Sequence, residues 1–91
     1  MNKYAIWTLE GRPCAMTGAD PDWNTVQIHE SEGLEQTIEV EAESWWEASG
    51  YFNAIRGVEP YGLPDWLTGE ARERARKQAD QGYRRGIQEQ T

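Results

Sequence analysis

The sequence contains few of the residues from which most catalytic and metal sites are built. Its 91 residues include one cysteine, Cys14, and one histidine, His29. A single cysteine excludes an intramolecular disulfide and a zinc site based on paired cysteines. Because Cys14 and His29 belong to different segments, a cysteine–histidine catalytic pair is not indicated. We expect Cys14 to be a small core thiol and His29 to be an exposed imidazole.

Signatures of nucleotide, calcium and membrane binding are also missing. The chain has no Gly-rich phosphate loop, no Gly-x-Ser-x-Gly turn and no acidic run with the spacing of a calcium loop. It has no signal-peptide pattern and no apolar run near the roughly 20 residues that cross a bilayer. The sequence therefore predicts a cytoplasmic protein that is not an enzyme, holds no cofactor or metal and does not contact a membrane.

Basic residues are scarce outside the C-terminal segment. Residues 1–69 contain twelve acidic and three basic residues, whereas residues 70–91 contain four acidic and six basic residues. The formal net charge of the chain is −7. An acidic body repels nucleic acid and attracts basic surfaces. We therefore expect a protein or ribonucleoprotein partner with a basic surface, and no direct binding to DNA or RNA.

Length and aromatic content predict one small domain. A chain of 91 residues is near the size at which a single core gives only modest stability. There are five Trp, four Tyr and one Phe, and each large ring can bury roughly 150–250 Å². We expect a core built largely from these rings, with some of them left outside.

A strand followed by a capped helix is predicted in the middle of the chain. Residues 37–43 alternate apolar and acidic side chains, as in a strand with one buried face. Ser44 and Glu47 have the spacing of a capping box, and Gly57 is a suitable residue for the end of the helix. Gly50 inside this helix indicates either close packing or a weak helix. The apolar stripe expected to lie on a sheet consists of Trp45, Ala48, Phe52 and Ile55.

Further strands are predicted before this unit. Residues 3–10 carry bulky side chains on both faces, which indicates a central strand, and residues 14–17 form a short return strand. Residues 25–30 alternate in polarity and predict a strand that pairs with residues 37–43 as a hairpin. In the loop before it, we expect the Trp23 ring to fold back on the sheet.

A loop and a second helix complete the expected domain. The Pro- and Gly-rich residues 58–67 predict a loop that packs through Tyr61, Leu63, Trp66 and Leu67. Residues 68–87 predict a helix, loosely attached because its apolar stripe is narrow: Ala71, Ala75, Ala79, Tyr83 and Ile87. Residues 1–91 thus form one α+β domain, with strands and the capped helix in residues 1–57. Its expected architecture is a three- or four-stranded antiparallel sheet with one helix packed across it and a C-terminal helix.

The main candidate for a binding site is a cluster of acidic residues without an intervening Lys or Arg. Its members are Glu30, Glu32, Glu35, Glu39, Glu41, Glu43 and Glu47. Three of them, Glu39, Glu41 and Glu43, are predicted on one strand face at about 6.6–6.8 Å spacing. That spacing is comparable with the separation of phosphates along a nucleic-acid strand. The row is therefore either a surface that fits a phosphate-binding groove or a solvated face that prevents aggregation.

Two tryptophans are candidate contacts for a partner. Adjacent helical residues point about 100° apart, so Trp45 and Trp46 cannot enter the same core. If Trp45 is inside, Trp46 is displaced, and it can then act as an interface anchor together with Trp66 of the loop. The alternative is that the C-terminal helix or its loop covers Trp46.

The small size, the acidic charge and the layout of strands leading into "EVEAESWWEA" resemble phage-encoded inhibitors of bacterial defence systems, the anti-CRISPR proteins among them. The resemblance implies stoichiometric binding in the host cytosol to a basic, nucleic-acid-binding surface, as a nucleic-acid mimic. One alternative is a self-associating structural or adaptor module, a homodimer in which the basic helix of one copy docks on the acidic sheet of another. Another is a small enzyme with an unrecognised carboxylate site.

Overall fold

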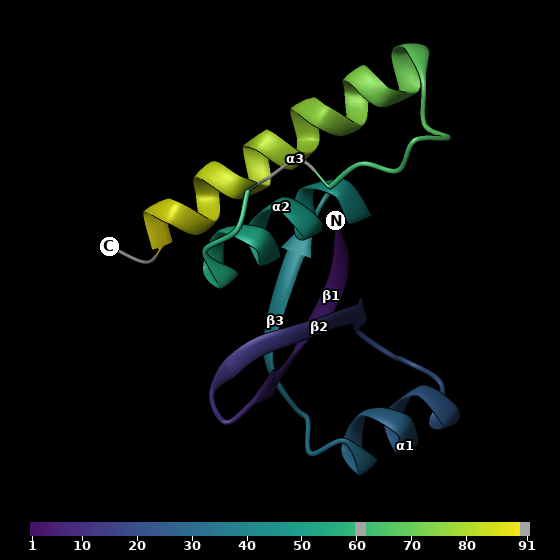
Figure 1. The fold of residues 1–91 in the computed structure, drawn as a ribbon, viewed down its shortest axis with the longest axis vertical. Coiled ribbons are helices and arrows are strands. Elements are labelled where there is room, and N and C mark those ends of the chain that lie inside the picture. Colours follow the sequence, from purple (N-terminus) through teal and green to yellow (C-terminus); the bar gives the residue numbers. More distant parts are fainter. Residues whose placement is uncertain (60–61, 90–91) are drawn as a thin grey trace.

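The computed structural model describes residues 1–59 and 62–89. Its elements are β1 (Asn2–Leu9), β2 (Arg12–Gly18), α1 (Trp23–Ser31), β3 (Glu35–Ala42), α2 (Trp45–Arg56) and α3 (Gly69–Glu89). The strands form a three-stranded antiparallel sheet in the order β2-β1-β3. In Figure 1, α2 lies between the sheet and α3, and α1 lies at the far end of the sheet. The predicted α+β class is confirmed.

The central position of β1 follows from its two apolar faces. Ala5, Ile6, Trp7 and Thr8 are all buried, and β1 pairs with β2 on one side and β3 on the other. The β1–β2 connection is Glu10-Gly11, both with positive φ, as in a two-residue hairpin turn. The predicted return strand is confirmed and is longer than expected, since it begins at Arg12.

The predicted strand over residues 25–30 is wrong, because this segment is helix α1. Asp22 begins the helix: its side chain accepts a hydrogen bond from the Thr25 N–H at 2.8 Å, which is the standard N-cap interaction. The hairpin predicted with residues 37–43 is wrong as well, since β3 pairs with β1. Trp23, expected to fold back on the sheet, is 72% exposed at the first turn of α1.

The predicted strand–cap–helix unit is confirmed. Val40 and Ala42 of β3 are buried and Ile38 is partly buried, whereas the acidic residues between them are exposed. The Glu47 N–H donates to Ser44 Oγ at 3.2 Å, and α2 ends at Gly57, which has left-handed backbone angles. The Glu47 carboxylate accepts from the Glu43 N–H, at 3.4 Å.

Helix α3 packs against α2 much more closely than its narrow stripe suggested. The residues that it buries are Ala75, Ala79, Gly82 and Gly86. A Cβ atom built on Gly82 would lie 1.8 Å from the Glu47 carbonyl oxygen, and one on Gly50 would lie 1.9 Å from the Ala79 carbonyl oxygen. Glycine at these positions therefore permits backbone contact between the helices. The expectation of a loosely attached helix does not fit this geometry, and the outer stripe residues Ala71 and Ile87 are exposed.

The core is less aromatic than expected. The buried apolar side chains are mainly aliphatic, and Trp7 is the buried aromatic residue among those described. In the loop before α3, Leu67 is buried, and Arg72 holds the chain by donating to the carbonyl oxygens of Pro64 and Leu67 at 3.0 and 2.9 Å. Tyr61, which was predicted to pack in this loop, lies outside the described residues.

Candidate protein-binding surface

Six of the seven predicted acidic residues are exposed, and they follow the chain from α1 into β3. Glu30 lies in the last turn of α1 and Glu32 is its C-cap residue. Glu35 begins β3, Glu39 and Glu41 lie within it, and Glu43 follows its last residue. The exposed members are Glu30, Glu32, Glu35, Glu39, Glu41 and Glu43.

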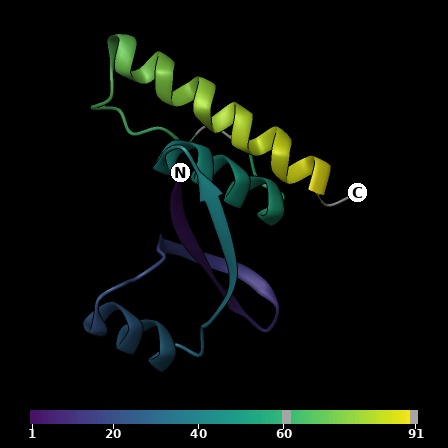
Figure 2. The ribbon, with the colours of Figure 1, turned by 180° about the vertical axis from the view of Figure 1, so that it is seen from behind.

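The row on β3 has the predicted alternation. Glu39 and Glu41 share one face of the strand, because Val40 between them is buried on the opposite face. The strand is also at the edge of the sheet, and Figure 2 shows it running in front of β1 and β2. The row therefore lies on an accessible border of the sheet, continued by the end of α1.

Two basic side chains of the protein itself lie beside the row, which corrects the expectation of a row without nearby cations. Lys3 of β1 places its Nζ 3.8 Å from Glu39 Oε1, with both side chains more than half exposed. Arg85 of α3 donates from Nη1 to the Glu41 carbonyl oxygen at 2.6 Å. An exposed pair such as Lys3–Glu39 contributes about 0–1 kcal/mol. The six exposed carboxylates thus keep a clear excess of negative charge.

Glu47 does not belong to the exposed surface, although the sequence placed it there. It is 2% exposed, and its Oε1 lies 3.7 Å from Arg85 Nη1. The other oxygen, Oε2, is buried without a hydrogen-bond partner among the described residues. The sequence signal for the buried position of Glu47 was its capping-box spacing from Ser44. In a capping box the carboxylate turns back toward the start of its own helix, here α2.

The acidic residues at the end of α1 are placed where the helix dipole disfavours them. The C-terminal end of a helix carries partial negative charge, and a carboxylate there typically costs about 0.3–1 kcal/mol. Glu30 and Glu32 both occupy this end. Helix stability therefore does not explain their presence.

The two predicted tryptophan contacts have different surroundings. Trp66 is 76% exposed, as a contact residue requires, so the prediction that this ring packs within its loop is wrong. Trp46 is partly buried and lines a cavity together with Leu63 of the loop. The assignment of Trp45 to the core is wrong: it is 43% exposed, and its ring meets Tyr4 edge-on at 5.7 Å.

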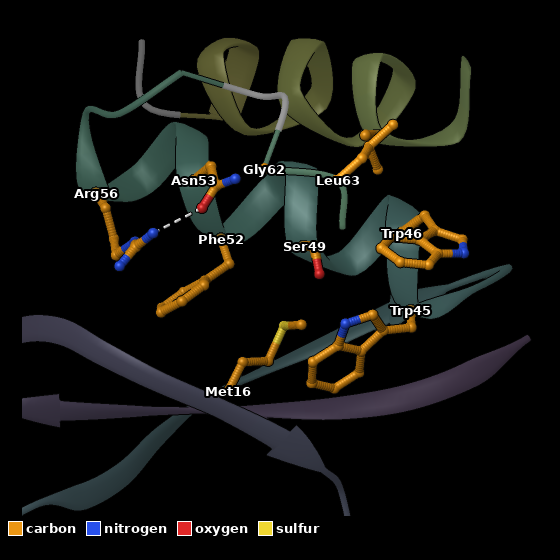
Figure 3. Close-up of a pocket in the computed structure, with 10 residues that line it drawn as sticks. Met16, Trp45, Trp46, Ser49, Phe52, Asn53, Arg56, Gly62 and Leu63 are labelled. Atoms are coloured by element: carbon orange, nitrogen blue, oxygen red, sulfur yellow. Dashed lines mark hydrogen bonds between the residues drawn. The ribbon is translucent and has the colours of Figure 1, made fainter. Parts of the chain in front are cut away.

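That cavity is a feature that the sequence interpretation missed. Figure 3 shows side chains of α2 facing Met16 of β2 across it, with Leu63 near Trp46. None of the six exposed acidic residues lines this cavity. The spacing of Trp45, Ser49 and Phe52 along one side of a helix was the available signal.

The two residues considered for catalysis lie on different elements, Cys14 on β2 and His29 on α1. The His29 ring meets Trp7 edge-on at 4.9 Å and is partly buried, so the expected exposed imidazole is wrong. Cys14 is exposed, which corrects the expected core thiol. Among the described residues, no group of three or more His, Cys, Asp and Glu residues could hold a metal ion. None of the described helices is long and apolar enough to span a membrane.

Comparisons with protein-family models, with curated proteins and with solved structures gave no match for this chain.

Proposed function

We propose that this chain is a non-enzymatic acidic protein that binds and blocks a basic, nucleic-acid-binding surface of a partner protein. The observation that supports it most is the run of six exposed carboxylates from Glu30 to Glu43 along an edge strand and the adjoining helix end. Such a surface attracts cationic groups over a distance of several ångströms, and salt weakens the attraction.

Two features favour a binding role over a merely solvated face. Charges on an edge strand also prevent aggregation, but that purpose does not require further carboxylates at the unfavourable end of α1. Neighbouring like charges on a strand face are destabilising. A cationic partner would offset both costs.

The partner that we propose is a protein or ribonucleoprotein whose basic groove normally holds phosphate groups. The regular spacing of Glu39 and Glu41 suits such a groove, and the resemblance to phage-encoded inhibitors makes bacterial defence complexes the first candidates. In this role the protein acts stoichiometrically, about one copy for each partner site.

The test is a pull-down from bacterial cytosol with the triple variant Glu39→Gln, Glu41→Gln and Glu43→Gln. These replacements keep side-chain shape and remove three charges. The matched control replaces Glu59, Asp65 and Glu70, three exposed acidic residues outside the surface, by Gln, Asn and Gln. Both variants have the same net charge, so a difference between them reports position and not total charge.

We expect the wild type and the control to retain a partner that the triple variant loses at physiological salt. The triple variant should unfold at the same temperature as the wild type or higher, because repulsion is relieved. Equal retention by all three proteins would exclude the carboxylate row as the binding surface.

A self-associating module is a second candidate, and one observation favours it. Helix α3 exposes Arg72, Arg74, Arg76 and Lys77 on the same chain that exposes the acidic surface. Light scattering at low and high salt distinguishes the two: growth of mass with protein concentration at low salt, absent from the triple variant, would support docking of α3 on the acidic surface of another copy.

A further inference from the structure

The cavity between α2 and β2 has the size and lining of a small-ligand site. Its volume is about 330 Å³, near the lower end of the ~300–1,000 Å³ typical of ligand pockets. Side chains from α2, from β2 and from the loop before α3 meet around it (Figure 3). Because separate elements form its walls, the cavity is a product of the fold and not of one helix.

The walls are mainly aromatic and apolar. Trp45 and Phe52 of α2 flank Met16, and Trp46 and Leu63 close one side (Figure 3). Aromatic rings attract one another most when they meet edge-on or offset. A planar aromatic group fits such walls better than a branched aliphatic one.

Polar groups are few and converge on the same space. The Ser49 hydroxyl points toward Met16 in Figure 3, and it has no hydrogen-bond partner among the described residues. A single hydroxyl in an apolar wall can orient a ligand through one hydrogen bond.

The charge at this cavity is opposite to that of the chain. Arg56 is the charged residue among the described residues that line it, whereas the whole chain has a net charge of −7. The guanidinium lies 4.4 Å from the Phe52 ring centroid, and Nη2 donates to Asn53 Oδ1 at 2.8 Å. These contacts hold Arg56 at one end of the cavity, and the side chain remains exposed.

We propose that this cavity binds a small aromatic carboxylate. The ring lies between Trp45 and Phe52, over Met16, and the carboxylate contacts the remaining N–H groups of Arg56. This site is separate from the acidic surface and does not depend on its proposed function.

The test compares 1-naphthylacetate with its neutral amide, 1-naphthylacetamide, by NMR titration of ¹⁵N-labelled full-length protein. The two probes share the ring and nearly the same shape, and they differ in charge. We expect both to shift the Trp45 and Trp46 indole signals and the Ser49 amide signal, and to leave the Trp23 and Trp66 indole signals unchanged. The carboxylate should bind about two- to fivefold more tightly, as expected for one partly exposed ion pair.

Two arginine variants distinguish a direct contact between Arg56 and the carboxylate probe from the effect of the protein's net charge. Arg56→Gln should abolish the preference for the carboxylate over the amide. Arg74→Gln makes the same change in net charge at an exposed position of α3 away from the cavity, so it should keep the preference. Acetate, which has the charge without the ring, should shift none of these signals.

Three results would overturn the proposed site. They are the absence of binding by either naphthyl probe, equal affinity for the carboxylate and the amide, and an equal loss of preference in Arg56→Gln and Arg74→Gln. The triple glutamine variant of the acidic row should bind both probes as the wild type does, so this test and the test of the acidic surface can fail independently.

Discussion

Arg85 of α3 contacts both the sheet and α2. Its guanidinium contacts the Glu41 carbonyl oxygen, the buried Glu47 and Glu89, and it lies 5.2 Å from the Tyr51 ring centroid. Glu47 in turn holds the start of α2 through the Glu43 N–H. One cation thus connects three elements and compensates a buried carboxylate, which is costly to leave without a cationic neighbour.

We expect Arg85→Ala to lower the free energy of unfolding by about 1–3 kcal/mol, because Glu47 would remain buried without its cation. Arg84→Ala is the matched control: Arg84 pairs with Asp80 on the exposed side of α3, so its loss should change stability by less than about 0.5 kcal/mol. Urea unfolding measures both. Equal effects would show that Glu47 does not depend on Arg85.

Tyr51 gives a pH-dependent test of the same contact region. Burial raises the pKa of Tyr51 to about 12, with a further contribution from a hydrogen bond to Glu89, while Arg85 opposes the rise. Because the pKa is higher in the folded state, the stabilisation is complete below the ordinary value of 10.0 and is lost as pH rises through 12.

Between these pH values the unfolding free energy of the wild type should therefore fall more steeply than that of Tyr51→Phe. Urea unfolding at a series of alkaline pH values measures both slopes. Parallel slopes would contradict the raised pKa.

At the level of single residues, the sequence predicted local interactions well and burial poorly. Ser44 and Gly57 were identified from spacing alone, because caps depend on nearby backbone groups. Trp45 was misassigned to the core, and the sequence left open whether Trp46 is covered, because the angular separation of the two rings does not say which neighbour covers which ring. Glu47 was misassigned because its cation lies 38 positions later in the chain, at Arg85.

At the level of the elements, glycine explains the close contact between α2 and α3. Gly50, Gly82 and Gly86 each face the other helix at distances that exclude a Cβ atom without movement. Glycine lowers intrinsic helix stability by about 1 kcal/mol relative to alanine. Its presence here is explained by packing and not by helix formation.

Gly50→Ala and Gly82→Ala should each destabilise the protein by about 1–3 kcal/mol, despite alanine's better helix propensity, because the new methyl group would meet the facing backbone. Gly18→Ala is the control, since a Cβ atom there has nothing within 4 Å. Thermal unfolding compares the three. Stabilisation by either helix variant would show that the helices are farther apart than described.

The start of α1 explains why its helical state was missed. Val26 and Ile28 are two residues apart, which is the spacing of one strand face and places them on opposite sides of a helix, and α1 buries none of its residues. The deciding interaction is the Asp22 cap, which also lowers the pKa of Asp22 through the Thr25 backbone hydrogen bond. The Asp-Trp-Asn-Thr spacing could have indicated it.

Asp22→Ala should reduce the helical signal in circular dichroism and speed the amide exchange of Val26 and Gln27, because the first turn loses its cap. Asp20→Ala removes the same charge two residues earlier, outside the helix, and should do neither. Identical spectra for the two variants would contradict a capping role for Asp22.

At the scale of the whole molecule, the packed helices and the acidic surface share one end of the sheet. Helices α2 and α3 pack at that end, and the acidic surface runs from there along β3 to α1 at the other end (Figures 1 and 2). The β3 alternation made the row predictable from the sequence. The position of Lys3 beside Glu39 was not predictable, because it requires the pairing of β1 with β3.

If the acidic surface takes the place of nucleic acid on a partner, as we propose, nucleic acid should compete with it for that partner. The partner retained by immobilised wild-type protein is challenged with increasing concentrations of a single-stranded oligonucleotide at constant ionic strength. We predict release of the partner in proportion to oligonucleotide bound, since both ligands need the same basic groups. A partner that binds the oligonucleotide and remains attached to the protein would show that the two ligands occupy different surfaces.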